Sequence, residues 1–402
     1  MIERSGDRAD VAKLLTGSDA DSLLKAASAE DGVELAGWSL RSVHHRGRRS
    51  VSAVYEATLV VDGGTREVLL VAHADSRPLP EGSFVLSSGG TDIAVWRFPY
   101  DPYLPGLRSA VHRRRVRELL DELDGPPGEV TLRTRAYRPS RRAVVEVTVV
   151  ERRVIGRILY LKVLAGGRAA AVADVHRQLD GVVPVPAVIG VAREQGIVAF
   201  EALRGATLRS ALVAGERVPG VEELIELSAA LAGSGLDTTR DPTRFADPTR
   251  HVKLLRRLVP EIEPMLLRAA AAAGAVDGPV APVHGDLHDA QVLVRRGAVV
   301  GLLDVDGAGT GRIAHDLGNL VAHLEATGET WAEARDRADA YAEEVAGAAR
   351  RLVPAADLAR AAAGAWLGLA TGAYRAQGER WPELTRRRIA RAHRWAVAAD
   401  RG

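Results

Sequence analysis

The sequence VHGDLHDAQVLV (residues 283–294) is followed within a few residues by VVGLLDVDG (residues 299–307). Each stretch contains a short apolar run that predicts a β-strand, with carboxylate and amide side chains beside it. Two such strands form a hairpin that presents these oxygens at one end. Phosphoryl transfer needs such a set, because a carboxylate must orient the attacking hydroxyl and further oxygens must hold Mg²⁺ against the phosphates. We therefore expect Asp286 to face the hydroxyl, and Gln291 and Asp304 to bind the metal.

The first part of the chain is predicted to be a helix followed by strands. The helix covers about residues 9–27, and the strands Val51–Val61 and Glu67–Ala74 flank the turn sequence Asp62-Gly63-Gly64. Residues 96–107 contain three prolines, which excludes regular structure there. A polar helix over about residues 108–123 then ends at Asp-Gly-Pro-Pro-Gly, which we interpret as a domain boundary.

Five strands and one helix are predicted after this boundary. The strands are Glu129–Tyr137, Ala143–Glu151, Arg157–Leu164, Ala187–Val191 and Ile197–Glu201, and the helix covers about Arg168–Leu179. From Leu203 onward the pattern is helical, apart from the strands Val292–Val294 and Val299–Leu303. A β-rich half followed by an α-rich half excludes a doubly wound sheet.

The composition limits the kinds of catalytic site, metal site and partner that the chain can have. The chain has no cysteine, which excludes disulfides, thiolate nucleophiles and cysteine-bound metals, so any metal is a hard ion such as Mg²⁺. Only four of the 54 basic residues are lysines, and Lys162 is the one that lies within a predicted strand. The net charge of +2 and the 4% of aromatic residues argue against a nucleic-acid partner. No apolar run has the length of a membrane span and the first residues are polar, so we expect a cytoplasmic protein that does not bind membranes.

His284-Gly285-Asp286 with Gln291, followed by Asp304, resembles the catalytic hairpin of the aminoglycoside phosphotransferase and choline-kinase-like superfamily. The resemblance covers about residues 129–390. It implies an α+β, two-lobed protein-kinase-like fold, with a β-rich N-lobe containing one helix and a helical C-lobe, plus an N-terminal α/β extension. The domains would be residues 1–125 (extension), 126–203 (N-lobe) and 204–402 (C-lobe). It also implies transfer of the γ-phosphate of ATP to a hydroxyl of a small-molecule alcohol.

The same resemblance implies the nucleotide site. Lys162 lies where the family's strand lysine binds the α/β-phosphates. The segment with Phe200, Glu201 and Leu203 resembles the hinge that binds adenine, and Ser140 and Arg141 lie in the loop that covers the phosphates. Downstream, Asp316-Leu317-Gly318 resembles the aspartate that supports the catalytic loop.

Three features depart from the family pattern. Gln291 stands where asparagine is commoner, which resembles the maltokinase and glucosamine-kinase branch, as does the N-terminal extension. The nucleotide-covering loop lacks glycine, so arginine or serine would meet phosphate there. The helix after Lys162 has no glutamate, and Asp174 is its only acidic residue.

Several alternatives remain open at this point. The departures are also compatible with a nucleotide-binding pseudokinase, whereas a metallophosphoesterase lacks its other motifs and a protein kinase lacks its activation segment. His284 is expected to hold the loop, and His288 either to orient substrate or to pack. Asp306 is either a second metal contact or a turn residue, and Trp366 and Tyr374 either line a pocket or belong to the core. The acceptor is expected to be a sugar or amino sugar, because arginine exceeds acid in the C-terminal helices; an aminoglycoside is the alternative.

Overall fold

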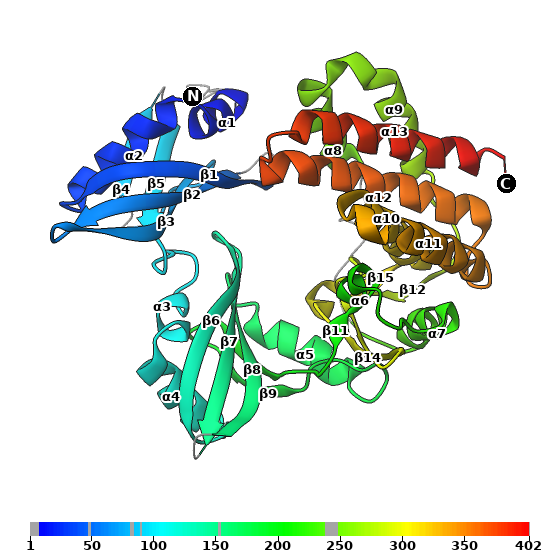
Figure 1. Cartoon of the computed structure of the whole chain (residues 1–402), viewed down its shortest axis with the longest axis horizontal. Helices are drawn as coiled ribbons and strands as arrows, with labels where there is room; N and C mark the ends of the chain where they lie inside the picture. Colours follow the sequence, from blue (N-terminus) through cyan, green and yellow to red (C-terminus); the bar gives the residue numbers. More distant parts are fainter. Residues whose placement is uncertain are drawn as a thin grey trace. The chain divides into compact units, whose positions relative to one another are not determined.

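The computed structural model describes residues 8–46, 50–80, 84–88, 91–151, 154–237 and 248–401. Its internal contacts divide the chain into two units (Figure 1). The first unit comprises Met1–Ala170, Ile189–Phe200 and Tyr374–Glu379, and the second comprises Ala171–Val188, Glu201–Ala373 and Arg380–Gly402.

The first unit begins with two helices and a five-stranded sheet. The helices are α1 (Arg8–Thr16) and α2 (Asp19–Glu30), and the strands are β1 (Glu34–Arg46), β2 (Ser50–Val61), β3 (Gly64–Asp75), β4 (Phe84–Ser88) and β5 (Thr91–Arg97). The strand order is β1-β2-β3-β5-β4. One face of the sheet packs against both helices around Leu15, Leu24 and Tyr55. The other face carries a small cluster around Trp96 that includes Tyr137.

Two sequence expectations for this region have different outcomes. The β2–β3 hairpin is confirmed: Val61 pairs with Gly64, and both turn residues have positive φ (Asp62 50°, Gly63 76°). The single helix over residues 9–27 is wrong, because the chain breaks between α1 and α2 at Gly17. A Cβ at Gly17 would lie 2.8 Å from the Lys13 carbonyl oxygen, so this turn requires glycine.

A second five-stranded sheet follows, with the predicted five strands and one helix. Its strands are β6 (Glu129–Arg138), β7 (Arg142–Glu151), β8 (Val154–Leu164), β9 (Val188–Ala192) and β10 (Ile197–Glu201), in the order β6-β7-β8-β10-β9, and its helix is α5 (Ala169–Leu179). The helix expected over residues 108–123 is interrupted, forming α3 (Leu107–Ala110) and α4 (Arg113–Glu122). Alternate residues of β7 and β8 are buried against α3 and α4, which gives this sheet a core of its own.

The second unit is mainly helical. Its helices are α6 (Leu208–Ala214), α7 (Val221–Ala232), α8 (Thr249–Leu258), α9 (Glu263–Gly274), α10 (Ile313–Thr330), α11 (Arg335–Ala349), α12 (Ala355–Ala376) and α13 (Trp381–Ala399), with short 3₁₀ turns at Pro260–Ile262, Val305–Gly307 and Ala332–Ala334. Its strands are β11 (Ala206–Thr207), β12 (Val280–Val283), β13 (Val292–Arg295), β14 (Ala298–Leu302) and β15 (Gly309–Arg312).

The predicted β13–β14 hairpin is confirmed, with Val292 opposite Leu302. The pattern missed β11, β12 and β15, which are short: β11 has two residues, β12 contains proline, and β15 contains glycine in place of alternating apolar residues. The α+β class, with sheets in the N-terminal half and helices in the C-terminal half, is as expected. Within the described residues, no helix is both long enough and apolar enough to span a bilayer.

Candidate active site

The catalytic loop, residues 284–291, joins β12 to β13 and is held by a buried aspartate. The carboxylate of Asp316, near the start of α10, accepts the N–H of His284 at 2.6 Å and that of Gly285 at 2.8 Å. Asp316 is 4% exposed, and burial raises its pKa, although the nearby His284 and these N–H groups partly oppose the rise. This is the supporting position that the sequence pattern indicated.

His284 fixes the same loop through its side chain. Its Nε2 donates to the Leu303 carbonyl oxygen at 2.8 Å, and its Nδ1 accepts the N–H of Asp286 at 3.2 Å. The ring is completely buried. His284 therefore connects the loop to the end of the β13–β14 hairpin, which is the structural role expected for it.

Asp286 follows on the loop and is exposed. Asn319 of α10 donates from Nδ2 to the Asp286 carboxylate at 3.4 Å and to the Leu287 carbonyl oxygen at 2.8 Å. The sequence analysis gave Asn319 no role. The only signal available was its place three residues after Asp316, which puts both side chains on one face of a helix.

Gln291 and Asp304 lie together, as the hairpin predicts. Gln291 immediately precedes β13, and Asp304 follows β14 in a left-handed conformation with φ of 59°. Nε2 of Gln291 lies 3.5 Å from Asp304 Oδ2. Amide and carboxylate oxygens are the ligands that hard divalent cations prefer, so this pair fits Mg²⁺.

Asp306 is placed differently. It is buried in the 3₁₀ turn after Asp304, and its Oδ1 lies 3.7 Å from Nε2 of His176, on α5. Trp366 is 1% exposed and belongs to a hydrophobic core, so the packing alternative holds for it.

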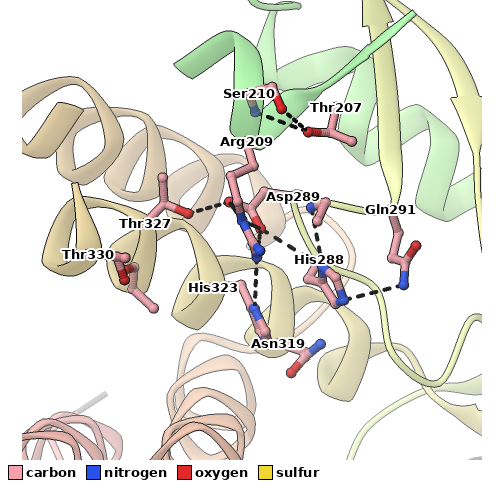
Figure 2. Close-up of polar contacts among 12 residues, drawn as sticks. Thr207, Arg209, Ser210, His288, Asp289, Gln291, Asn319, His323, Thr327 and Thr330 are labelled. Carbon is pink, nitrogen blue, oxygen red and sulfur yellow. Dashed lines mark hydrogen bonds and ion pairs between the residues drawn. The ribbon is translucent and has the colours of Figure 1, made fainter. Parts of the chain in front are cut away.

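A second polar cluster includes His288 and Asp289 of the same loop (Figure 2). The Asp289 carboxylate is completely buried; Arg209 of α6 binds it at 2.6 Å, and the Thr327 hydroxyl donates to it at 2.5 Å. The rings of His288 and His323 are stacked, with centroids 4.5 Å apart and planes 15° apart. Burial lowers the pKa of each of these two histidines to about 3, so both are neutral.

Three members of this cluster have the composition of a metal site. Ligand atoms of His288, Asp289 and His323 lie within 4.8 Å of one another. The Arg209 guanidinium, however, binds the Asp289 carboxylate and contacts His323 Nδ1 at 3.4 Å (Figure 2). A cation would be repelled by this guanidinium, so we interpret the cluster as a support for the catalytic loop.

The first unit contains the predicted lysine and the nucleotide-covering loop. Lys162 on β8 has its Nζ 6.0 Å from the centre of the Phe200 ring on β10, so these two predicted residues lie side by side. Glu201 and Leu203 belong to the second unit. Asp174 on α5 pairs with Arg177 at 3.0 Å on an exposed surface.

The β6–β7 hairpin tip, residues 138–142, is held by a residue that the sequence analysis missed. Asp101 accepts the Ser140 N–H at 2.9 Å and the Tyr137 hydroxyl at 2.8 Å, and Tyr137 in turn accepts from Trp96 Nε1 at 3.0 Å. Ser140 has φ of 57° and is 8% exposed. Asp101 also accepts the N–H of Tyr103, a local turn typical of aspartate that was the one available signal.

The model of the family described as "Phosphotransferase enzyme family" matches residues 165–352, a little under half of the chain. The matched region includes Asp286, Gln291 and Asp304 and begins just after Lys162. No curated protein is detectably similar to the chain.

Solved structures with similar architecture include three phosphotransferases or kinases. A thermostable mutant of aminoglycoside phosphotransferase APH(4)-Ia, in complex with ADP and hygromycin B, is 17% identical over 71% of this chain and 97% of its own, with a TM-score of 0.44. Macrolide 2′-phosphotransferase MphH from Brachybacterium faecium is 18% identical over 68% and 97%, with a TM-score of 0.39. A choline/ethanolamine kinase family protein from Mesorhizobium loti is 17% identical over 71% and 95%, with a TM-score of 0.47. The match to this phosphotransferase family covers residues 165–352, and it agrees with the expected class of enzyme, a small-molecule phosphotransferase.

Proposed function

We propose that this protein transfers the γ-phosphate of ATP to a hydroxyl group of a small molecule, with Asp286 as the catalytic carboxylate. The observation that carries the proposal is the geometry of the catalytic loop. An exposed carboxylate stands on a loop whose backbone is fixed from two sides, by Asp316 and by the His284 ring, next to the adjacent side chains of Gln291 and Asp304. Rigid placement of a base beside a cation site is what phosphoryl transfer requires.

The roles follow from the chemistry of each group. Asp286 accepts a hydrogen bond from the acceptor hydroxyl and orients it, and Asn319 holds one oxygen of that carboxylate. Gln291 and Asp304 hold Mg²⁺, which would neutralise charge on the phosphates. Lys162 binds phosphate, and Phe200, Glu201 and Leu203 form the adenine-binding segment. Because the Ser140 N–H is bonded to Asp101, the exposed side chain of Arg141 is the stronger phosphate ligand at the hairpin tip.

For the acceptor we propose a neutral or singly amino-substituted sugar. Two glutamates of α10 are candidates for binding a polycationic drug, but both are already paired. Glu329 binds Arg387 and Arg388, each at 2.8 Å. Glu325 accepts from the indole N–H groups of Trp366 and Trp395, with Arg391 at 3.6 Å. Acids neutralised in this way do not offer partners to desolvated ammonium groups. The similarity to the maltokinase and glucosamine-kinase branch, through Gln291 and the N-terminal extension, points the same way.

The test is an ATP-consumption screen with purified protein over sugars, amino sugars, aminoglycosides including hygromycin B, macrolides and choline-like alcohols. We expect turnover of a sugar or amino sugar that depends on Mg²⁺ and is lost in Asp286→Asn. High kcat/KM for an aminoglycoside with no turnover of sugars would overturn the acceptor proposal alone. Nucleotide binding without turnover of any acceptor would favour the pseudokinase alternative.

A further inference from the structure

His288 contacts Gln291, the predicted metal ligand. The hydrogen bonds that His288 makes bear on whether the oxygen or the nitrogen of the Gln291 amide faces it. The His288 side chain is 14% exposed, and its Nδ1 accepts the N–H of Ala290 at 3.2 Å. A ring nitrogen that accepts an N–H carries a lone pair and no proton. Asp289 Oδ1, at 3.9 Å from Nδ1, lies beyond hydrogen-bond distance and accepts from Arg209 instead.

The neutral imidazole therefore has its single proton on Nε2. The Nε2–H group faces the terminal amide of Gln291, and the atom drawn as nitrogen lies 3.4 Å away (Figure 2). Two donors do not pair. The oxygen and nitrogen of an amide are distinguished by their hydrogen bonds, and a carboxamide turned from the orientation drawn, with Oε1 facing His288, gives this donor an acceptor in place of the contact between Gln291 Nε2 and Asp304.

This rotation changes what faces Asp304. The same amide atom lies 3.5 Å from Asp304 Oδ2, so the rotated amide presents an oxygen to the carboxylate. Two oxygens that converge without a hydrogen between them repel each other, and a divalent cation that both coordinate removes the repulsion. We propose that His288 is a positioning residue that turns the carboxamide oxygen of Gln291 toward Asp304 and so completes the oxygen pair for the divalent cation. The proposal rests on the function proposed above for this hairpin.

The surroundings of His288 are built to hold this orientation. The ring is stacked on His323, whose Nδ1 contacts Arg209 at 3.4 Å. Arg209 is in turn fixed by the buried Asp289 carboxylate. Groups in the outer shell of a metal site commonly fix the orientation of the ligands in this way.

The first experiment reads the histidine tautomer directly. Long-range ¹⁵N–¹H spectra of the full-length protein, recorded without nucleotide or metal and assigned by comparison with His288→Gln, distinguish the two neutral forms. We expect a protonated Nε2 and an unprotonated Nδ1 for His288. The opposite tautomer would overturn the proposal, whatever the activity of the protein.

The second experiment measures cation binding in three variants, by Mn²⁺ titration in the presence of ADP and by the Mg²⁺ dependence of turnover. We expect His288→Leu, which removes the donor, to weaken cation binding about 10–100-fold, as is typical for outer-shell partners. His288→Gln places an N–H near the position of Nε2 and should restore most of the loss. His323→Leu is the matched control, because it removes the stacked ring but no contact to Gln291. Equal losses in His288→Leu and His323→Leu would assign the effect to packing and overturn the proposal.

The third experiment separates the orientation of the Gln291 carboxamide from the other effects of substituting His288. In Gln291→Glu, oxygen stands on both sides of the ligand, so its orientation no longer matters. We expect adding His288→Leu to that background to change Mn²⁺ affinity by less than about threefold, a clear non-additivity. If His288→Leu weakened Mn²⁺ binding in that background as much as it does in the wild type, the result would contradict the proposal. If no acceptor is ever phosphorylated, the spectra and the Mn²⁺ titration still give their result, so failure of the proposed function is distinguishable from failure of this inference.

Discussion

The β6–β7 hairpin tip in the first unit and the catalytic loop in the second are each held by one buried aspartate that accepts backbone N–H groups. Asp316 binds two consecutive residues of its loop, at 2.6 and 2.8 Å. Asp101 binds the Ser140 N–H and the Tyr137 hydroxyl, at 2.9 and 2.8 Å. Burial raises the pKa of both carboxyls.

The two aspartates lie in different parts of the sequence. Asp316 stands in the first turn of α10, inside the region that matches the phosphotransferase family. Asp101 stands in the proline-containing segment after β5 and outside that region, and it reaches the hairpin across 36 to 39 residues of sequence. The catalytic loop is thus supported from within the family region, whereas the hairpin tip depends on the segment that follows the N-terminal sheet. We expect this difference to separate chemistry from nucleotide binding.

Asp286→Asn should give the largest effect on the catalytic-loop side of the comparison. Loss of the catalytic carboxylate should lower kcat about 10²–10⁴-fold while the dissociation constant for ATP stays nearly unchanged. Steady-state turnover and a separate ATP-binding titration measure the two quantities. Retention of more than about a tenth of wild-type turnover would remove Asp286 from this role, since general acid–base catalysis contributes more than that.

Asp316→Ala should mainly reduce stability. It leaves the N–H groups of His284 and Gly285 buried without an acceptor, at a cost of about 1–3 kcal/mol each. Urea unfolding measures the loss. Asp316→Asn keeps one acceptor oxygen in place and serves as the control, so we expect it to lose less. Equal losses in the two variants would show that side-chain volume, and not hydrogen bonding, matters at this position.

Asp101→Ala should weaken the binding of ATP. Freeing the Ser140 N–H loosens the hairpin tip, and we expect the KM for ATP to rise about fivefold, the equivalent of one hydrogen bond of about 1 kcal/mol. The kcat at saturating ATP should not change. Tyr137→Phe removes one bond to Asp101 but leaves the bond to Ser140, so its KM should stay closer to that of the wild type. A fall in kcat with no change in KM would contradict the division of roles between the two loops.

The smallest expected effect is a pH dependence of stability. Because the pKa of Asp101 is raised in the folded protein, the carboxyl binds its proton more tightly when folded than when unfolded. Its contribution to stability is therefore complete below the unfolded-state pKa and is lost as the pH rises through the folded-state pKa. The difference in unfolding free energy between wild type and Asp101→Asn should fall across that interval and stay constant above it. Urea unfolding at a series of pH values measures this difference. A difference that rises with pH would show that the pKa of Asp101 is lowered in the folded protein instead.

Much of the fold was predictable because its signals are local. Alternating apolar residues predicted β6, β7 and β8, and the Asp-Gly turn predicted the β2–β3 hairpin. The break at Gly17 and the short strands β12 and β15 were not predictable in the same way. Backbone pairing between segments about 30 residues apart, such as Val283 with Gly309, defines β12 and β15, and it leaves no periodic side-chain pattern.

The sequence by itself predicted the hairpin that groups Asp286, Gln291 and Asp304, because these residues lie close together along the chain and two antiparallel strands must bring them together. Through residue periodicity it also determined the order of β6, β7, β8, α5, β9 and β10 along the chain. The tertiary structure alone decided what supports these residues. Asn319, Arg209, His323 and Asp101 meet their partners across 33 to 114 residues, through contacts that depend on how separate elements pack. Buried polar groups must find partners wherever packing places them, and no local pattern records where that is.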